Sequence, residues 1–313
     1  MEKWPVLGRM FGKKGEQGKK KEGKEGKLEI VCAYATEASE RHPKRNGDSF
    51  FIDKENLSAG VFDGMSTPYG DQLASSACAE HVKNNIYKIA DGTSVEKALV
   101  IMEEILEGAD SVVAEPERYK EERDLYQSIG GDMDKVPGTT ASVFKIHTDY
   151  EGIKRVIIGN VGNSRIYKIE ESGTLTQLTE DNDILELYYP DKKQRALVSR
   201  KLSNIKNSED LSDDKEKLAF KKKNFLSMAI GAGIDNAQTL SLEVKTGDRF
   251  LLLTDGILNL TTIEMEEIIN KYKNALKIVE VLLDRAKKES RKGKKENARA
   301  NPDDMTAVVV EIK

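Results

Sequence analysis

The sequence predicts an α+β fold in which antiparallel sheets are covered by helices. Short β-like runs recur along the 313 residues, and they are too numerous and too short for a parallel barrel. Between them lie stretches whose apolar residues are spaced by three or four positions, as on one face of a helix. Pairs of strands combined with blocks of helices are typical of this fold class.

The β-like runs are rich in Val, Ile, Phe and Leu, and most end at polar or glycine-containing turns. We expect strands at 30–35, 49–52, 59–62, 141–146, 155–158, 165–169, 250–253 and 307–312. The apolar spacing predicts helices at about 73–89, 95–113 and 263–286.

The first 27 residues differ in composition from the rest of the chain. They carry eight lysines and Arg9 against four glutamates, and no apolar residue follows Phe11 up to residue 27. Such a segment cannot bury enough surface to offset its ordering entropy, so we expect a disordered leader over 1–27 and a folded domain over 28–313. Weak contact of the basic leader with a membrane or an acidic partner stays open.

Two internal segments are strongly polar. Residues 186–223 mix charges with Ser and Asn, which predicts a mobile flap or lid. Residues 285–300 are basic and are expected to be a solvated loop or helix end, with contact to an acidic partner as the alternative. The net charge of −4 does not indicate a nucleic-acid-binding protein. No long apolar run or secretory signal is present, so we expect a cytoplasmic protein.

Zinc is poorly supported, because the chain has only three histidines and two cysteines, all widely spaced. Three aspartates instead share one local setting at the edge of an apolar run: Asp63, Asp255 and Asp303. Each alone is ordinarily a turn residue, but several carboxylates brought together are costly unless a cation neutralises them. An all-oxygen site of this kind suits Mg²⁺ or Mn²⁺, and a pair of such ions can activate water and clamp a phosphoryl group. The glycine-rich nucleotide-binding, dinucleotide-binding and serine-hydrolase motifs are absent from the sequence.

An ordered series of motifs resembles the metal-dependent protein serine/threonine phosphatases of type 2C, the PPM family. The motifs are RNGDSFFI (45–52), VFDGM (61–65), GTTASV (138–143), IGNVGNSRIY (158–167), QLTEDN (177–182), LSMAIGAG (226–233), FLLLTDGI (250–257) and DDMTAVVV (303–310). The resemblance implies two stacked antiparallel sheets flanked by helices, an α/β/β/α four-layer sandwich. It also implies hydrolysis of phosphoserine or phosphothreonine by metal-activated water at a binuclear centre.

Site residues follow from the resemblance position by position. Asp63 resembles the carboxylate that bridges the two metals, and Gly64 resembles the residue whose backbone carbonyl completes one coordination shell. Asp255 and Asp303 are similar to the ligands of the second metal. Asp48 matches an acidic residue that contacts the metal shell through water.

The first motif and the residues before it depart from the family pattern at two positions, 47 and 43. Gly47 stands where the family usually has Glu, so one group that would orient a metal-bound water is missing. Pro43 stands where the family has its phosphate-binding Arg. Arg45 is the first candidate to replace that Arg and Arg41 the second, because a guanidinium can clamp phosphate with two hydrogen bonds.

Other departures lie beside the expected metals. Met65 follows the Asp-Gly pair where some members have His, so the leaving alcohol would take its proton from water. Asn163 replaces an Asp that members often use for a third metal, which predicts a weakened third site. Residues 66–68 replace a glycine pair, and the loop there is altered.

The leading interpretation is an active protein phosphatase that acts opposite a serine/threonine kinase, with monomer as the default oligomeric state. The alternative is a pseudophosphatase or phosphoprotein-binding scaffold with weak or no catalysis. A third interpretation, a phosphatase for a small phosphorylated metabolite, differs from the leading one only in its substrate. The 186–223 flap would decide between a protein substrate and a metabolite.

Overall fold

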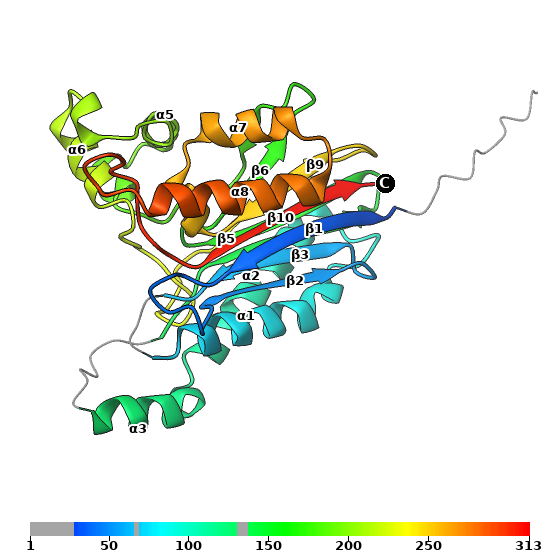
Figure 1. Cartoon of the computed structure of the whole chain (residues 1–313). Coiled ribbons are helices and arrows are strands. Elements are labelled where there is room, and N and C mark those ends of the chain that lie inside the picture. The colour runs from blue at the N-terminus through cyan, green and yellow to red at the C-terminus, as the bar shows by residue number, and fades with distance from the viewer. Residues whose placement is uncertain (1–27, 66–68, 130–136) are drawn as a thin grey trace, which may run out of the picture.

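A computed structural model describes residues 28–65, 69–129 and 137–313, and its strands form two five-stranded antiparallel sheets (Figure 1). The expected leader at 1–27 and the altered loop at 66–68 lie outside the described residues. The first sheet has the order β1-β10-β9-β6-β7, with bounds Ile30–Glu37, Met305–Ile312, Arg249–Leu253, Arg165–Ile169 and Leu175–Gln177. The second has the order β2-β3-β4-β5-β8, with bounds Asp48–Asp53, Ser58–Asp63, Ala141–Thr148, Lys154–Val161 and Gln238–Glu243.

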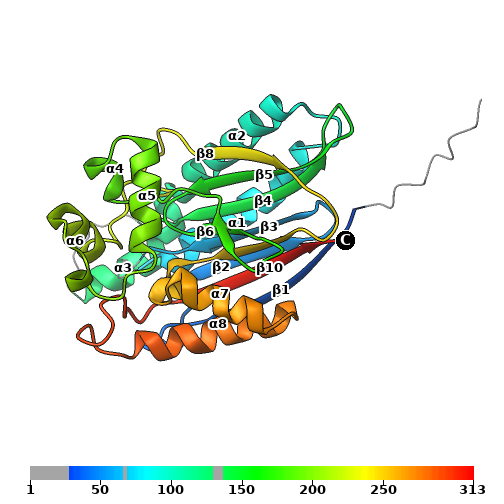
Figure 2. The same ribbon diagram turned by 90° about the horizontal axis from the view of Figure 1, so that it is seen from above.

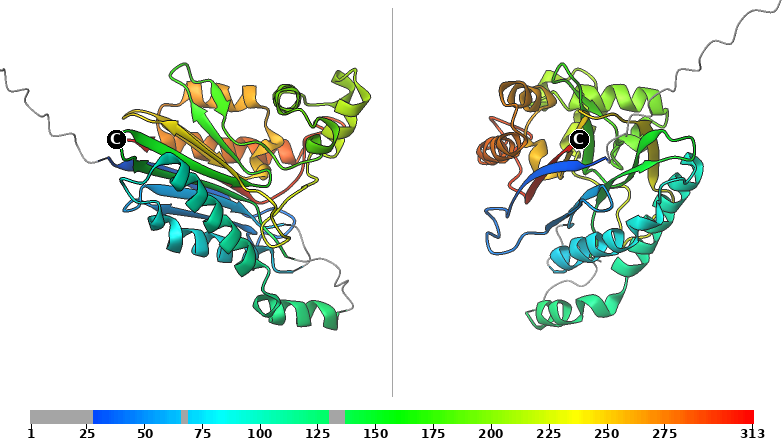
Figure 3. Two further views of the ribbon diagram at one scale, coloured as in Figure 1. Left: turned by 180° about the vertical axis from the view of Figure 1, so that it is seen from behind. Right: turned by 90° about the vertical axis from the view of Figure 1, so that its right-hand side faces the viewer.

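Helices cover the outer face of each sheet, which makes four layers (Figures 2 and 3). The second sheet packs against α1 (Asp71–Asn85) and α2 (Val95–Val113), and the first packs against α7 (Thr262–Lys271) and α8 (Ala275–Ser290). The remaining helices are α3 (Lys120–Ser128), α4 (Leu185–Tyr188), α5 (Lys192–Leu202) and α6 (Asp214–Lys221), with 3₁₀ turns η1 (Ile86–Lys88), η2 (Pro116–Tyr119), η3 (Ser208–Asp210) and η4 (Asp255–Asn259). The predicted α+β class and the four-layer arrangement are both confirmed.

The two sheets and the two helical layers are separated by three apolar clusters. Each sheet is buried on both faces, so it packs against the other sheet on one side and against helices on the other. Between the sheets, Val61, Phe144, Phe250 and Val308 belong to one buried cluster. Two further clusters lie between each sheet and its helices. This stacking fixes the ends of strands from both sheets against one another.

The eight expected strands are all present, and two short strands, β7 and β8, were not predicted. The expectation of one helix over 263–286 is wrong, because the structure has α7 and α8 with a break between them. Tyr272 is extended, with φ −117° and ψ 128°, and the Asn274 side chain accepts a hydrogen bond from Lys277 N to begin α8. An N-cap of this kind favours a new helix start over continuation. The helix α3 was also not predicted.

The flap segment at 186–223 is mostly helical rather than a long irregular loop. Its helices α4, α5 and α6 share a small core, which contains Leu185, Val198, Leu202 and Phe220 among its buried residues. Asp191 and Asp213 cap α5 and α6 by accepting from Gln194 N and Glu216 N. The flap therefore has a folded structure of its own.

The basic run at 285–300 begins in α8, and most of its basic residues are exposed, as expected. Arg299 is the exception, because its side chain is almost fully buried. Arg299 donates to the carbonyls of Leu202 and Ile205 in the flap and of Leu258 in η4. This one arginine therefore departs from the expected solvated run, since it joins the flap to the segment that follows β9. Throughout residues 28–65, 69–129 and 137–313, the helices are too short or too polar to cross a membrane.

Candidate metal centre

The expected ligands meet where strand ends from both sheets come together. Asp48 begins β2 and lies opposite Asp63, the last residue of β3. In the other sheet, Asp255 follows β9, and Asp303 precedes β10, which pairs antiparallel with β9. Because the sheets stack, these four carboxylates share one edge of the sandwich. The four expected aspartates thus lie near one another, and their role as metal ligands stays a prediction.

Hydrogen bonds between the two sheets tie this edge together. Thr254 Oγ1 donates to Asp48 Oδ2 at 2.7 Å, and Asp255 N lies 3.4 Å from Asp63 Oδ2. On the opposite side of Asp63, Thr140 Oγ1 accepts from the Asp63 backbone N–H at 3.0 Å, and Thr140 N donates to the Asp63 carbonyl at 2.9 Å. Two hydrogen bonds to Thr140 thus hold the backbone of Asp63, and its side chain reaches toward Asp255 at the end of β9 in the first sheet.

The carboxylates perturb one another strongly. Burial raises the pKa of Asp63 well above its ordinary value, and the charges of Asp255, Asp48 and Asp303 raise it further. Burial, followed by the charge of Asp255, raises the pKa of Asp303 to about 7. The pKa of Asp48 is also raised, mainly by burial, although hydrogen bonds from Thr254 and Thr306 oppose the rise. Such a cluster favours a bound cation, because the cation removes the repulsion.

The donor chemistry fits a hard divalent ion. The centre offers carboxylate oxygens and backbone carbonyls, and Asp48 Oδ1 is buried with no hydrogen-bond partner among the described residues. In the same ranges, however, no group of three His, Cys, Asp or Glu side chains converges in a ready metal-binding arrangement. Binding therefore requires the mutually repelling carboxylates to draw together around the ion.

Gly64 could not be replaced at this edge without a backbone shift. A Cβ atom there would lie 2.4 Å from the carbonyl oxygen of Asp71 and 2.5 Å from that of Gly47. Both neighbours are backbone atoms and cannot rotate away. The chain needs glycine at 64 because β3, α1 and the loop before β2 approach one another this closely.

Asp303 and Asp304 have different roles although they are adjacent. Asp304 accepts hydrogen bonds from Ser39 N at 2.6 Å and Gly47 N at 2.7 Å, so it anchors the loop before β2. Asp303 Oδ2 instead accepts from Asn301 Nδ2 at 2.8 Å. Among the neighbouring charges, that of Asp255 raises the pKa of Asp303 the most.

The two candidate phosphate-binding arginines occupy different surroundings. Arg45 Nη2 forms an ion pair with Asp71 Oδ2 at 2.9 Å, and the side chain stays 35% exposed. Arg41 is exposed, and its charge partly lowers the pKa of Asp303, against the larger effect of burial. Arg41 is therefore close enough to act on Asp303 of the cluster, whereas Arg45 pairs with Asp71 of α1.

Asn163 contacts the centre directly. Its Nδ2 donates to Asp255 Oδ2 at 2.9 Å. A neutral amide thus occupies one oxygen of this carboxylate, in the position where the resemblance implies an Asp and a third metal.

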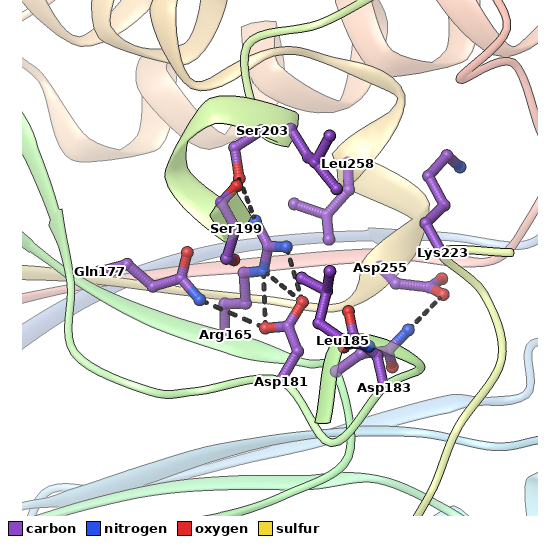
Figure 4. A network of polar contacts seen from close by, with 12 residues as sticks. Arg165, Gln177, Asp181, Asp183, Leu185, Ser199, Ser203, Lys223, Asp255 and Leu258 are labelled. Atoms are coloured by element: carbon purple, nitrogen blue, oxygen red, sulfur yellow. Dashed lines mark hydrogen bonds and ion pairs between the residues drawn. The ribbon is translucent and has the colours of Figure 1, made fainter. Parts of the chain in front are cut away.

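A pocket adjoins the aspartate cluster beneath the flap (Figure 4). Its wall includes Arg165, which makes a two-pronged ion pair with Asp181: Nε to Oδ1 at 2.9 Å and Nη2 to Oδ2 at 2.6 Å. Lys223 lies beside Asp255 in the same wall. Burial and the Arg299 guanidinium lower the pKa of Lys223 to about 8, while Asp255 partly opposes this. The pocket connects the flap to the candidate centre.

Sequence reasoning missed several residues that build the centre. Thr140 and Thr254 hold Asp63 and Asp48 in place, and Asp304, which the sequence already placed beside the site, anchors the loop that carries Arg45, a role that was not expected. Their positions inside the GTTASV, FLLLTDGI and DDMTAVVV motifs were visible signals. Their hydrogen-bond partners lie up to 265 positions away in the chain, so the sequence did not reveal them.

No family model and no curated relative matches the sequence. Solved structures do match. The serine/threonine phosphatase PstP/Ppp of Mycobacterium tuberculosis superposes with a TM-score of 0.62 at 17% identity, over 90% of this chain and 98% of that one. Its catalytic domain in complex with two manganese ions gives 0.61 at 17% identity, over 91% and 99%.

Two further solved structures agree with this result. The PPM Ser-Thr phosphatase MsPP of Mycobacterium smegmatis matches at 19% identity with a TM-score of 0.61, over 90% of this chain and 97% of that one. The serine/threonine phosphatase Stp1 of Staphylococcus aureus gives 0.62 at 17% identity, over 91% and 95%. The described chain therefore has the fold of the PPM-type serine/threonine phosphatases.

Proposed function

We propose that this protein is a metal-dependent protein serine/threonine phosphatase. The observation that carries the proposal is the meeting of Asp48, Asp63, Asp255 and Asp303 at one edge of the sandwich, with pKa values of Asp48, Asp63 and Asp303 raised by burial and mutual repulsion. A structural role does not account for this cluster, since unpaired buried carboxylates are costly. Perturbed carboxylates of this kind are typical of functional sites.

The chain's own residues would hold two Mn²⁺ or Mg²⁺ ions in the following way. Asp63 would be the carboxylate shared by both ions, the Gly64 carbonyl would add a further oxygen ligand, and Asp255 and Asp303 would supply theirs from the other sheet. When bound, such ions supply a water-derived nucleophile at neutral pH and clamp the phosphoryl group. The unpartnered Asp48 Oδ1 is placed to accept a hydrogen bond from a water in this site.

Substrate binding requires a cation that faces the phosphoryl group. Arg45, and after it Arg41, is the candidate, because both lie in the loop that leads into Asp48 at the start of β2 and a guanidinium can donate two parallel hydrogen bonds to phosphate. Solved structures of the same fold are named serine/threonine phosphatases, which supports a phosphorylated protein as substrate. A cytoplasmic monomer that opposes a serine/threonine kinase is the corresponding cellular setting.

Two positions of this site carry residues that differ from those of the family pattern. Asn163 donates to Asp255 and brings no charge for a third ion, so we expect a weak third site. Met65 provides no proton donor beside the Asp-Gly pair, so the leaving alcohol takes its proton from water.

A second candidate is a pseudophosphatase that binds phosphoproteins with little or no catalysis. Gly47 and Asn163, which stand where the resemblance implies acidic residues, are the observations that point to this alternative. All four expected carboxylates are nevertheless present, and the active form is the simpler interpretation.

Turnover assays separate the two candidates. The full chain is incubated with p-nitrophenyl phosphate and with a phosphothreonine peptide, first with Mn²⁺ or Mg²⁺ and then with EDTA. Metal-dependent phosphate release that EDTA abolishes is the expected result. No release from either substrate, combined with tight phosphopeptide binding in calorimetry, would replace the phosphatase with the binding protein.

A further inference from the structure

Position 47 is a glycine where the family pattern has Glu, and two carboxylates from other parts of the chain lie beside it. If Gly47 carried a Cβ atom, that atom would lie 3.0 Å from Asp304 Oδ2 and 3.2 Å from Asp71 Oδ2. Both distances are tighter than ordinary contacts. Asp304 Oδ2 already accepts a hydrogen bond from the Gly47 backbone N–H at 2.7 Å. Asp71 is the other carboxylate beside this space, and its charge is directed away from Gly47.

Asp71 belongs to a different part of the fold from the loop that it meets. It is the first residue of α1, and its side chain is only 4% exposed. Its Oδ1 accepts from Gln72 N at 2.7 Å, and its backbone carbonyl packs against Gly64. A carboxylate as buried as this needs a cationic partner.

That partner is Arg45, the first candidate for binding phosphate. Arg45 Nη2 lies 2.9 Å from Asp71 Oδ2, while Arg45 Nε is buried without a hydrogen-bond partner among the described residues. The remainder of the guanidinium is partly exposed. One side of the guanidinium is therefore fixed to α1, and donors on it remain available for a ligand.

We propose that Asp71 is a positioning residue that holds Arg45 toward the phosphoryl group of the substrate. It acts from α1, next to Gly47, through its ion pair with Arg45. The inference rests on the proposed function and deepens it, because it selects Arg45 over Arg41 as the phosphate-binding arginine and states how Arg45 is oriented. A guanidinium fixed by a buried carboxylate loses less freedom when it binds an oxyanion.

The isosteric variant Asp71→Asn removes the charge and keeps the shape. With p-nitrophenyl phosphate and Mn²⁺ we expect KM to rise about tenfold with kcat within about twofold, since the ground-state hold on phosphate weakens. Calorimetry with inorganic phosphate on the Mn²⁺-loaded protein should show the same rise in Kd. The Kd for Mn²⁺ should stay within about twofold of the wild type.

Arg45→Gln removes the other partner of the Arg45–Asp71 ion pair. Together with the double variant, the two single variants form a double-mutant cycle. If Asp71 acts through Arg45, Asp71→Asn has no further effect on the phosphate Kd once Arg45 is replaced. Additive losses would contradict the inference. A loss of Mn²⁺ affinity as large as the loss of phosphate affinity would also contradict it, because Asp71 would then act on the metal centre.

The matched control is Asp149→Asn. Asp149 is a buried carboxylate that pairs with Arg155 at 2.6 Å, and it lies in the turn after β4, at the end of that strand away from Thr140. Both variants should lower Tm, but only Asp71→Asn should change the phosphate Kd. An unchanged phosphate Kd in Asp71→Asn overturns the inference, whereas a wild type that binds phosphate without metal-dependent turnover overturns the proposed function instead.

Discussion

Replacing Asp255 with Asn should change stability in opposite directions with and without metal. After burial, Asp255 is the leading neighbouring charge that raises the pKa of both Asp63 and Asp303. The pKa of Asp303 rises from 3.8 to about 7, and each unit corresponds to about 1.4 kcal/mol. Burial contributes the largest part, so we assign about 1 kcal/mol of relief at neutral pH to the removal of the Asp255 charge.

In EDTA, Asp255→Asn should therefore raise the free energy of unfolding by about 1 kcal/mol, or Tm by about 2 °C for a chain of this length. The asparagine keeps an oxygen that can accept the hydrogen bond from Asn163. With Mn²⁺ at about 100 times its Kd, the wild type gains about 2.7 kcal/mol from binding, and the variant should lose most of this gain together with its turnover.

Urea denaturation at pH 7.5, in EDTA and in Mn²⁺, measures both effects on the same protein. Asp235→Asn is the control, because Asp235 is exposed and lies outside the cluster. A variant that is less stable than the wild type in EDTA would refute the repulsion argument. A variant that retains Mn²⁺ stabilisation and turnover would refute the assignment of Asp255 as a ligand.

Three further predictions concern packing, linkage and the flap. Gly64→Ala should cost about 2 kcal/mol and weaken Mn²⁺ binding, because its Cβ meets two backbone oxygens, whereas Gly293→Ala faces open space and should be neutral; equal urea midpoints would contradict this. In EDTA, folded Asp303 keeps its proton up to about pH 7, whereas unfolded Asp303 loses it near pH 3.8. The contribution of Asp303 to stability therefore falls as the pH rises between these values. Tm measured from about pH 4 to 8 should show this fall in the wild type and less of it in Asp303→Asn. Arg299→Met leaves three carbonyls without their donor and should cost about 3 kcal/mol, with faster amide exchange in the flap; unchanged exchange there would show that Arg299 does not anchor it.

The sequence predicted most strands because their apolar pattern is local. It also located the aspartates correctly at strand ends, since Asp63, Asp255 and Asp303 follow or precede apolar runs directly. The single helix expected over 263–286 failed because a local cap at Asn274 outweighs the continuing apolar spacing. Arg299 was expected in a solvated run because its burial depends on carbonyls of the flap and of η4, which are distant in the chain.

By itself, the sequence determined the fold class and indicated the kind of chemistry that we propose for the chain. Strand and helix periodicities are short-range properties, and few histidines with repeated Asp at strand edges already indicated oxygen ligands for a hard metal. Only the tertiary structure decided which carboxylates repel one another and that Asp71, from α1, reaches the space left at Gly47 and pairs with Arg45. These contacts join residues that are far apart in the chain, and they form only when the two sheets stack and α1 packs beside the loop before β2.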